Sequence, residues 1–177
     1  GVSPLDSEVE WRTRQVLRDM AGTATVDILS GAPLAELLAR VAKEPTDTIV
    51  LWLGQWRDRD GRSYESIQVL QAISAVSAAP VYGLWESQLG FGVAAGNMEP
   101  YGLRGQMVGQ LVRDALAGQT PAAGRAVLSV PTRCVADARA LRHWSLDAAR
   151  LPSDCEVRFA ERPLWRQYWW QIALTIA

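Results

Sequence analysis

Histidine and cysteine are scarce in this chain of 177 residues, and their scarcity excludes several kinds of site. The single histidine, His143, has no acid–nucleophile pair near it in sequence, and no G-x-S-x-G elbow supplies a serine. We therefore expect His143 to be a surface or packing residue. The two cysteines, Cys134 and Cys155, lack metal-site spacing and are too few for a disulfide framework. They are expected to be either two separate buried thiols or one disulfide formed in an oxidising compartment.

An excess of charge is missing as well. Lysine and arginine number 18 against 19 aspartates and glutamates, which gives a formal net charge of −1. Such a balance gives no electrostatic reason to expect nucleic acid or an anionic surface as a partner. No Walker loop or G-x-G-x-x-G follows a predicted strand, because the glycines at 83, 90, 92 and 96 fit neither spacing. We expect a domain that is not an enzyme and holds no cofactor or metal.

No apolar run is long enough to span a membrane, although one begins at the end of the sequence. Trp165, Tyr168, Trp169 and Trp170 cluster beside arginine and precede the apolar residues of 171–177. This order is typical of the interfacial belt that flanks a membrane helix. Spanning takes about 20 apolar residues. The segment is therefore expected to be either a packed C-terminal helix or the start of a transmembrane helix.

The remaining sequence is rich in apolar residues with clear periodicity. Hydrophobic residues make up 49% of the chain, which suits one compact α/β domain or two small lobes with a real core. Apolar spacing and capping signals predict the elements. Helices are expected from the capping box at Ser7 to Gly22 and over residues 33–43, 64–77, 101–117 and 137–144, and strands over 25–30, 48–53, 80–84, 90–96, 126–131 and 156–159.

Helices and strands alternate in this pattern, which predicts a parallel sheet with helices on both faces. The uninterrupted apolar run over 48–53 indicates a strand covered on both sides. The helix over 101–117 is expected to turn five residues inward: Leu103, Met107, Leu111, Val112 and Leu116. The pattern opens on a helix, and a right-handed βαβ unit that includes this helix would require a strand before Gly1. We expect the chain to be the later part of a larger protein.

Unusual side chains follow two of the predicted strands. Trp56, Arg57 and Tyr64 come after the strand over 48–53, and Trp85 and Glu86 come after the strand over 80–84. Ligands of open parallel sheets bind beyond the carboxyl ends of the strands. Aromatic rings mixed with hydrogen-bonding groups are typical of a small-molecule cleft. Here the rings could stack on a ligand, Arg57 could pair with an anion, and Glu86 with a cation or donor; simple packing of the tryptophans is the alternative.

Two segments resemble a known family. "PVYGLWESQLGFGVAAGNMEPYGLRGQMVGQLVRDALAG", residues 80–118, resembles the stretch of type I periplasmic-binding-protein-like domains where the chain crosses between lobes. The similarity is greatest to the ABC-transporter-substrate-binding-like sensor domains of membrane-bound histidine kinases. "LPSDCEVRFAERPLWRQYWWQI", residues 151–172, resembles the segment before the second transmembrane helix of such sensors.

The resemblance implies an α/β lobe over 1–88, a crossover and return segment over 89–160, and a juxtamembrane segment with the start of a transmembrane helix over 161–177. The second lobe would be largely missing, and Trp85 and Glu86 would lie at the hinge, facing the interlobe cleft. The implied function is that of an extracytoplasmic, small-solute-binding sensor domain of a two-component histidine kinase. It would lie at the periplasmic face of the inner membrane, attached by the segment after Trp165, and could form a homodimer. A substrate-binding protein of an ABC transporter and a flavodoxin-like enzyme are the alternatives.

Overall fold

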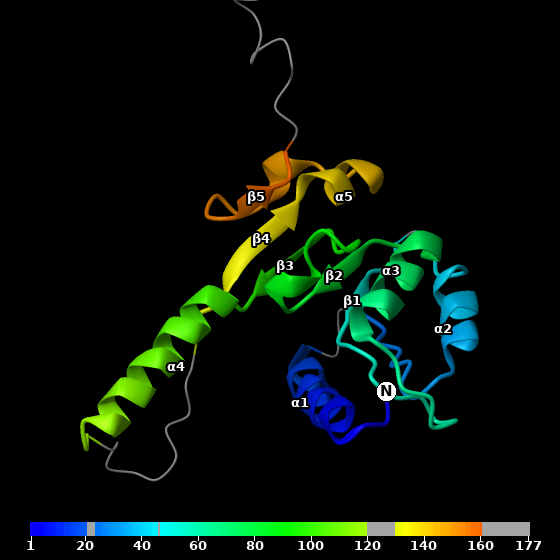
Figure 1. Cartoon of the computed structure of the whole chain (residues 1–177). Coiled ribbons are helices and arrows are strands. Elements are labelled where there is room, and N and C mark those ends of the chain that lie inside the picture. The colour runs from blue at the N-terminus through cyan, green and yellow to red at the C-terminus, as the bar shows by residue number, and fades with distance from the viewer. Residues whose placement is uncertain (21–23, 46, 120–129, 161–177) are drawn as a thin grey trace, which may run out of the picture.

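The computed structural model describes residues 1–20, 24–45, 47–119 and 130–160 (Figure 1). Its elements are helices α1 (Pro4–Met20), α2 (Leu34–Val41), α3 (Ser66–Val76), α4 (Tyr101–Leu116) and α5 (Ala138–His143), strands β1 (Val50–Trp52), β2 (Val81–Gly83), β3 (Ala95–Met98), β4 (Arg133–Asp137) and β5 (Glu156–Arg158), and the short 3₁₀ turns η1 (Glu86–Gln88) and η2 (Ala148–Arg150). The predicted α/β class is confirmed.

The five strands form one mixed sheet in the order β1-β2-β3-β4-β5. β1, β2 and β3 are parallel, β4 runs antiparallel to β3, and β5 is parallel to β4. The prediction of an entirely parallel sheet is therefore wrong at the β3–β4 pair. Met98 at the end of β3 pairs with Arg133 at the start of β4, so the connection through α4 returns to the edge it left and reverses the strand.

Side chains on the two faces of the sheet belong to two apolar clusters. On one face, Val81 of β2 and Val135 of β4 pack in a cluster with α2 and α3, to which Leu70 and Ile73 contribute. On the other face, the smaller cluster includes Ala95, Ala136 and Leu141 of α5. The first cluster is the main core, and α5 covers only the middle strands on the opposite face.

β1 is an edge strand, and the prediction that it is covered on both faces is wrong. Leu51 is 40% exposed, and Ile49 just before the strand is 66% exposed. Leu51 lies in register with Tyr82, on the same face of the sheet as Ala95 and Ala136. Since α5 packs on the middle strands, nothing in the described chain covers this end of that face.

The N-terminal part differs from the expectation in two places. The capping box is formed by Ser3 and Asp6 instead of starting at Ser7: the amide of Ser3 donates to the Asp6 carboxylate at 2.8 Å, and the amide of Asp6 donates to the Ser3 hydroxyl at 3.1 Å. Pro4 then occupies the first helical position, where a missing amide proton costs nothing. The predicted strand over residues 25–30 is not formed; this segment is mostly exposed and pairs with no strand.

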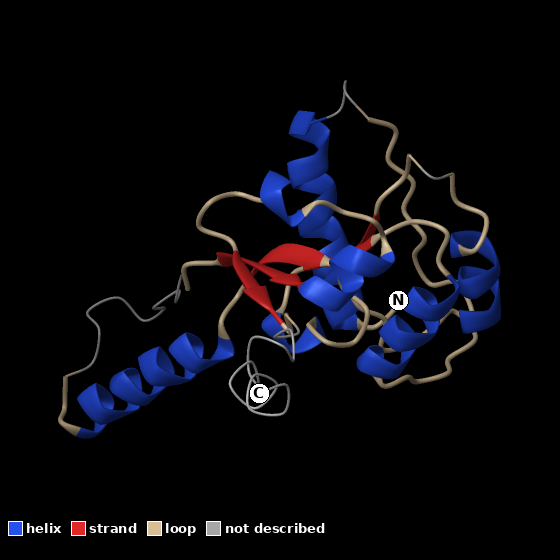
Figure 2. Cartoon of the chain, turned by 90° about the horizontal axis from the view of Figure 1, so that it is seen from above, coloured by secondary structure: helices blue, strands red, loops and turns tan. Residues whose placement is uncertain are grey.

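α4 has the predicted bounds but not the predicted packing. It projects from the rest of the molecule in both views (Figures 1 and 2), and none of its residues is buried. Leu103, Met107 and Leu111 are partly buried, whereas Val112 is 53% and Leu116 84% exposed. The expected inward stripe is wrong because no described element packs along the helix.

The last described elements agree with the expectation. Asp137 caps α5 through a hydrogen bond from the amide of Arg139, and β5 falls within the predicted strand over 156–159. Of the predicted strand over 126–131, residues 126–129 lie outside the described residues, and 130–131 are not in a strand. The segment 161–177 also lies outside them. Within the described residues no helix is both long enough and apolar enough to cross a membrane.

A disulfide joins Cys134 of β4 to Cys155, which immediately precedes β5. Of the two alternatives left open by the sequence, the disulfide is the one present. It links residues separated by 21 positions, with their Cα atoms 4.5 Å apart. β4 and β5 are thereby held together covalently as well as by hydrogen bonds.

Candidate functional site

The carboxyl ends of β1 and β2 lie at the same edge of the sheet, and the loops that follow them touch. The indole rings of Trp56 and Trp85 meet edge to face, with centroids 6.4 Å apart and an interplanar angle of 70°. Such pairs contribute about 0.5–1.5 kcal/mol beyond the area they bury. Both rings remain partly exposed. The structure thus brings together two of the five residues predicted for the site.

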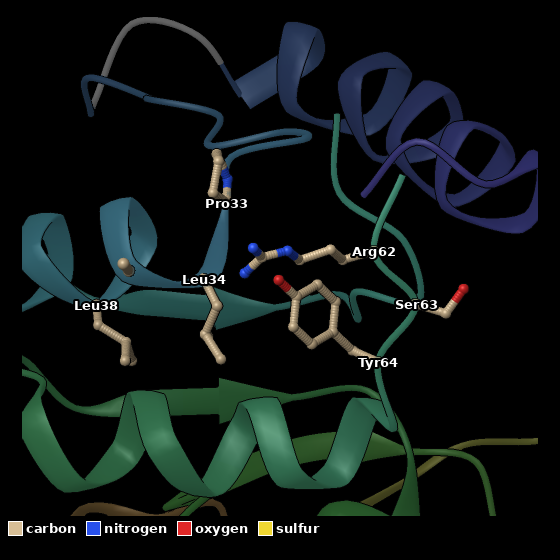
Figure 3. Close-up of a pocket in the computed structure, with 7 residues that line it drawn as sticks. Pro33, Leu34, Leu38, Arg62, Ser63 and Tyr64 are labelled. Atoms are coloured by element: carbon tan, nitrogen blue, oxygen red, sulfur yellow. The ribbon is translucent and has the colours of Figure 1, made fainter. Parts of the chain in front are cut away.

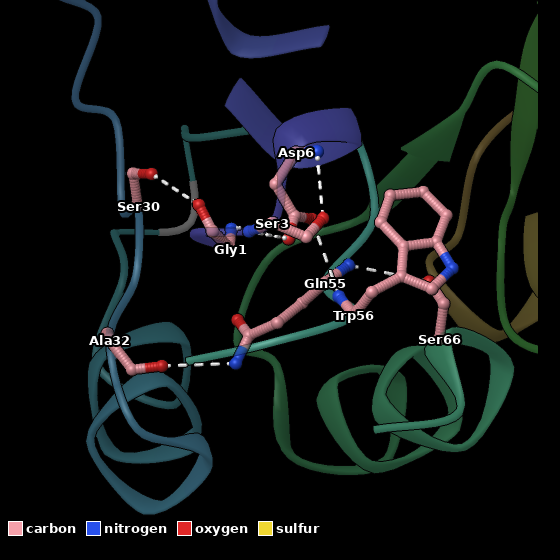
Figure 4. Close-up of polar contacts among 8 residues, drawn as sticks. All are labelled: Gly1, Ser3, Asp6, Ser30, Ala32, Gln55, Trp56 and Ser66. Carbon is pink, nitrogen blue, oxygen red and sulfur yellow. Dashed lines mark hydrogen bonds and ion pairs between the residues drawn. The ribbon is translucent and has the colours of Figure 1, made fainter. Parts of the chain in front are cut away.

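The loop that carries Trp56 is anchored by buried polar groups (Figure 4). Gln55 is fully buried, and its side-chain amide donates to the carbonyl of Ala32 at 3.1 Å. The backbone amide of Gln55 donates to the hydroxyl oxygen of Ser66 at 3.4 Å. The amide of Trp56 donates to Asp6 of α1, also at 3.4 Å. These bonds join the loop to α1, to α3 and to the segment just before α2, and they fix the direction of the Trp56 backbone.

A single glutamine fixes the loop that carries Trp85. The side-chain oxygen of Gln88 accepts hydrogen bonds from the amide of Leu84 at 3.0 Å and from that of Trp85 at 3.2 Å. Gln88 is the last residue of the turn η1 and is itself buried. Trp85 also forms an isolated parallel bridge with Glu99, just beyond β3. These contacts restrain the backbone that carries the Trp85 ring.

Two glycines next to this loop allow the backbone to pack closely. Gly92 has φ +108°, and a Cβ there would overlap the side chain of Ser74 on α3. A Cβ on Gly96 would lie 1.9 Å from the carbonyl oxygen of Gly83, which is main chain and has little freedom to move. The missing side chain of Gly96 lets β3 approach β2, and that of Gly92 lets the segment before β3 pack against α3.

Tyr64 stabilises the loop between β1 and α3 by a hydrogen bond to Asp58 within the same loop. Its hydroxyl donates to the carboxylate of Asp58 at 2.7 Å, and the amides of Asp60 and Arg62 donate to the same carboxylate at 3.0 and 2.9 Å. Burial raises the pKa of Asp58, but the hydrogen bonds from Tyr64 and the two amides outweigh it, and the pKa is lowered. The same bond to Asp58 raises the pKa of Tyr64. The donor of the Tyr64 hydroxyl is already used within the protein.

The ring of Tyr64 lines a hollow of about 600 Å³ at the start of α2 (Figure 3). Leu34 and Leu38 contribute apolar walls, and the side chain of Arg62 lies beside the tyrosine hydroxyl. Neither Trp56 nor Trp85 lines this hollow. It is therefore separate from the tryptophan pair.

Arg57 and Glu86 occupy very different surroundings. Arg57 is exposed, makes no ion pair with any described residue, and joins the loop through its backbone, whose carbonyl accepts from the amide of Val2 at 2.8 Å. Glu86 is paired with Arg133 at 2.8 Å and with Arg158 at 2.5 Å. Burial raises the pKa of Glu86, but hydrogen bonds from the two arginines outweigh it, and the pKa is lowered. A cationic ligand would have to displace one of these arginines.

Glu86 also borders a second hollow, of about 540 Å³, between η1 and the start of α4. Pro100, Leu103 and Arg133 contribute to its walls. The five residues predicted for one cleft are thus distributed over a tryptophan pair, two hollows and an exposed arginine. No group of three or more potential metal ligands occurs within the part of the chain that the structure describes.

The sequence interpretation missed the buried polar residues that hold the two loops, namely Asp6, Gln55, Asp58 and Gln88. For Asp6 a signal existed in Ser3-Pro4-Leu5-Asp6, which has the capping-box spacing with proline at the first helical position. For Asp58 the signal was the turn that ends in Asp60-Gly61. Gln55 and Gln88 carry no comparable mark in the sequence.

Comparison with models of known protein families, with curated proteins and with solved structures finds no match to this chain.

Proposed function

We propose that this chain is the extracytoplasmic sensor domain of a two-component histidine kinase and binds a small solute where β1 and β2 end. The observation that carries the proposal is the Trp56–Trp85 pair at the shared carboxyl edge of two parallel strands. That edge is where open α/β sheets bind ligands. The partly exposed rings offer flat apolar surface, and their rigidly held backbones reduce the entropy lost on binding.

Other features of the chain favour this assignment. The Cys134–Cys155 disulfide suits an oxidising compartment such as the periplasm. The aromatic residues before the apolar segment 171–177 have the composition of a membrane interface, which suits attachment at the periplasmic face of the inner membrane. Within this proposal, the fold is a type I periplasmic-binding-protein-like lobe, and the strands after β2 belong to its crossover to a second lobe.

The expected ligand is a small molecule with a planar apolar part and an anionic group. The two indoles would contact the planar part through ring faces or edges. The exposed guanidinium of Arg57, next to Trp56 in the chain, is available to pair with a carboxylate. Binding would shift the kinase only to the extent that the solute prefers one arrangement of the domain over another.

Isothermal titration calorimetry against amino acids, aromatic carboxylates and small organic cations tests the proposal. We expect at least one aromatic carboxylate to bind, and we expect Trp85→Ala to abolish the binding. Trp11→Ala is the matched control, because Trp11 is 58% exposed on α1 and belongs to neither loop. Equal affinity of the Trp85→Ala and Trp11→Ala proteins would remove the tryptophan pair from the site. No binding across the whole panel would overturn the proposed function.

A further inference from the structure

Glu86 of η1 is the centre of a network of four charged side chains that joins η1 to β4 and β5. Arg133 of β4 and Arg158 of β5 both reach Glu86, and both also reach Glu156 of β5, at 3.2 and 2.7 Å. Two arginines and two glutamates therefore form a closed ring with no net charge. The Glu86 side chain is only 17% exposed, so solvent screens its contacts less than those of a surface pair.

The network is held on one side by the disulfide. Arg133 directly precedes Cys134, and Glu156 directly follows Cys155. The bond between the two cysteines therefore fixes the spacing of the strands from which three of the four charges project. β4 and β5 are thus joined covalently and by strand pairing, and both contact the turn η1 through Glu86.

On the other side the network is continuous with the tryptophan pair. Glu86 follows Trp85 directly in the chain, and Gln88 binds the amides of both Leu84 and Trp85. A displacement of the Trp85 ring that moves its backbone must therefore move Glu86, and Glu86 is bonded to Arg158 at 2.5 Å. Arg158 stands at the end of β5, close in sequence to the segment 161–177.

We propose that Arg158 is a positioning residue that couples the Trp85 loop to β5, so that occupation of the tryptophan site changes how firmly β5 is held. The inference deepens the proposed function, on which the role of a solute rests, but the coupling itself is a property of the free protein. Coupling between two sites is reciprocal. A change in either element is therefore felt in the other.

Hydrogen–deuterium exchange on the unliganded protein tests the coupling in both directions. Arg158→Gln should raise the exchange rate of the Leu84 and Trp85 amides, as well as that of β5, about tenfold, as expected for loss of a hydrogen bond to a charged group. Trp85→Ala should in turn raise exchange in β5. Arg158→Lys, which keeps the charge but not the planar fork, should fall between the wild-type protein and Arg158→Gln.

Glu99→Gln is the control variant. The Glu99 side chain is also 17% exposed and is paired with Arg104, its backbone forms a bridge with Trp85, and among the described residues no ion pair joins it to β5. It should leave β5 exchange at the wild-type rate. If Arg158→Gln accelerates β5 alone and leaves Leu84 and Trp85 unchanged, the coupling is refuted. If that variant does not fold, judged by near-ultraviolet circular dichroism, the Arg158→Lys protein decides by the same comparison.

The same measurement separates this inference from the proposed function. An aromatic carboxylate that binds at Trp85 and leaves β5 exchange unchanged overturns the inference but not the solute-binding function. Reciprocal exchange effects in a protein that binds none of the panel uphold the coupling and overturn the solute-binding function.

Discussion

Removal of the Cys134–Cys155 disulfide should lower the free energy of unfolding by about 3 kcal/mol. The perturbation is the double substitution Cys134→Ser with Cys155→Ser, which keeps the side-chain size and leaves no free thiol. The bridge closes a loop of residues separated by 21 positions. The chain-entropy relation for a loop of that length gives about 3 kcal/mol at 25 °C, which the unfolded chain regains as conformational freedom when the bridge is absent.

Urea unfolding followed by far-ultraviolet circular dichroism measures this effect. With a slope of about 2 kcal/mol per molar urea, the midpoint should fall by about 1.5 M in the double variant. Addition of a reductant should lower the midpoint of the wild-type protein by a similar amount and leave that of the double variant unchanged. Coincident midpoints of the oxidised wild-type and serine proteins would show that the bridge does not restrain the unfolded chain and would refute the reasoning.

Five further substitutions, two of them controls, test the packing and the charges. Gly96→Ala should lower the free energy of unfolding by about 1–3 kcal/mol in thermal melts, because its Cβ would meet a backbone carbonyl 1.9 Å away; Gly109→Ala, in open space on α4, should raise it by up to about 1 kcal/mol. Leu70→Ala, at a fully buried site, should cost about 2–5 kcal/mol in urea unfolding, whereas Leu116→Ala, 84% exposed, should change it by less than about 0.5 kcal/mol. The lowered pKa of Glu86 contributes stability that is fully present above the ordinary pKa of a glutamate and is lost as the pH falls through the lowered folded-state pKa. Glu86→Gln should therefore lose less stability than the wild-type protein between about pH 5 and pH 3, and equal slopes would contradict this.

Elements whose signals are local could be predicted from the sequence. α2 and α3 carry apolar residues at helical spacing that pack into the main core, and Asp137 marks the start of α5 by its own side chain. The predictions were wrong where contacts between residues distant in sequence determine the structure. The apolar run around β1 resembles that of a central strand, yet its place at the sheet edge leaves Leu51 exposed.

In the candidate site, too, some features follow from the order of elements in the sequence and others depend on contacts between distant residues. That Trp56 and Trp85 lie together follows from parallel pairing of two successive strands, and the order of elements is enough to suggest it. The hydrogen bond from the amide of Trp56 to Asp6 joins residues 50 positions apart, and Arg133 pairs with Glu86 across 47 positions. No local pattern records such contacts, so the sequence suggested Glu86 as a ligand contact and not as the centre of an ion network.

No residue of α4 is buried, so the helix receives little stabilisation from the rest of the described chain. Gly102, Gly105 and Gly109 each disfavour the helix by about 1 kcal/mol relative to alanine, and all three face open space. A helix of 16 residues with this composition is marginal in water unless its apolar side is covered. The helical fraction of α4 should therefore increase when another surface covers its apolar side. The helical signal of the protein in far-ultraviolet circular dichroism should increase with it.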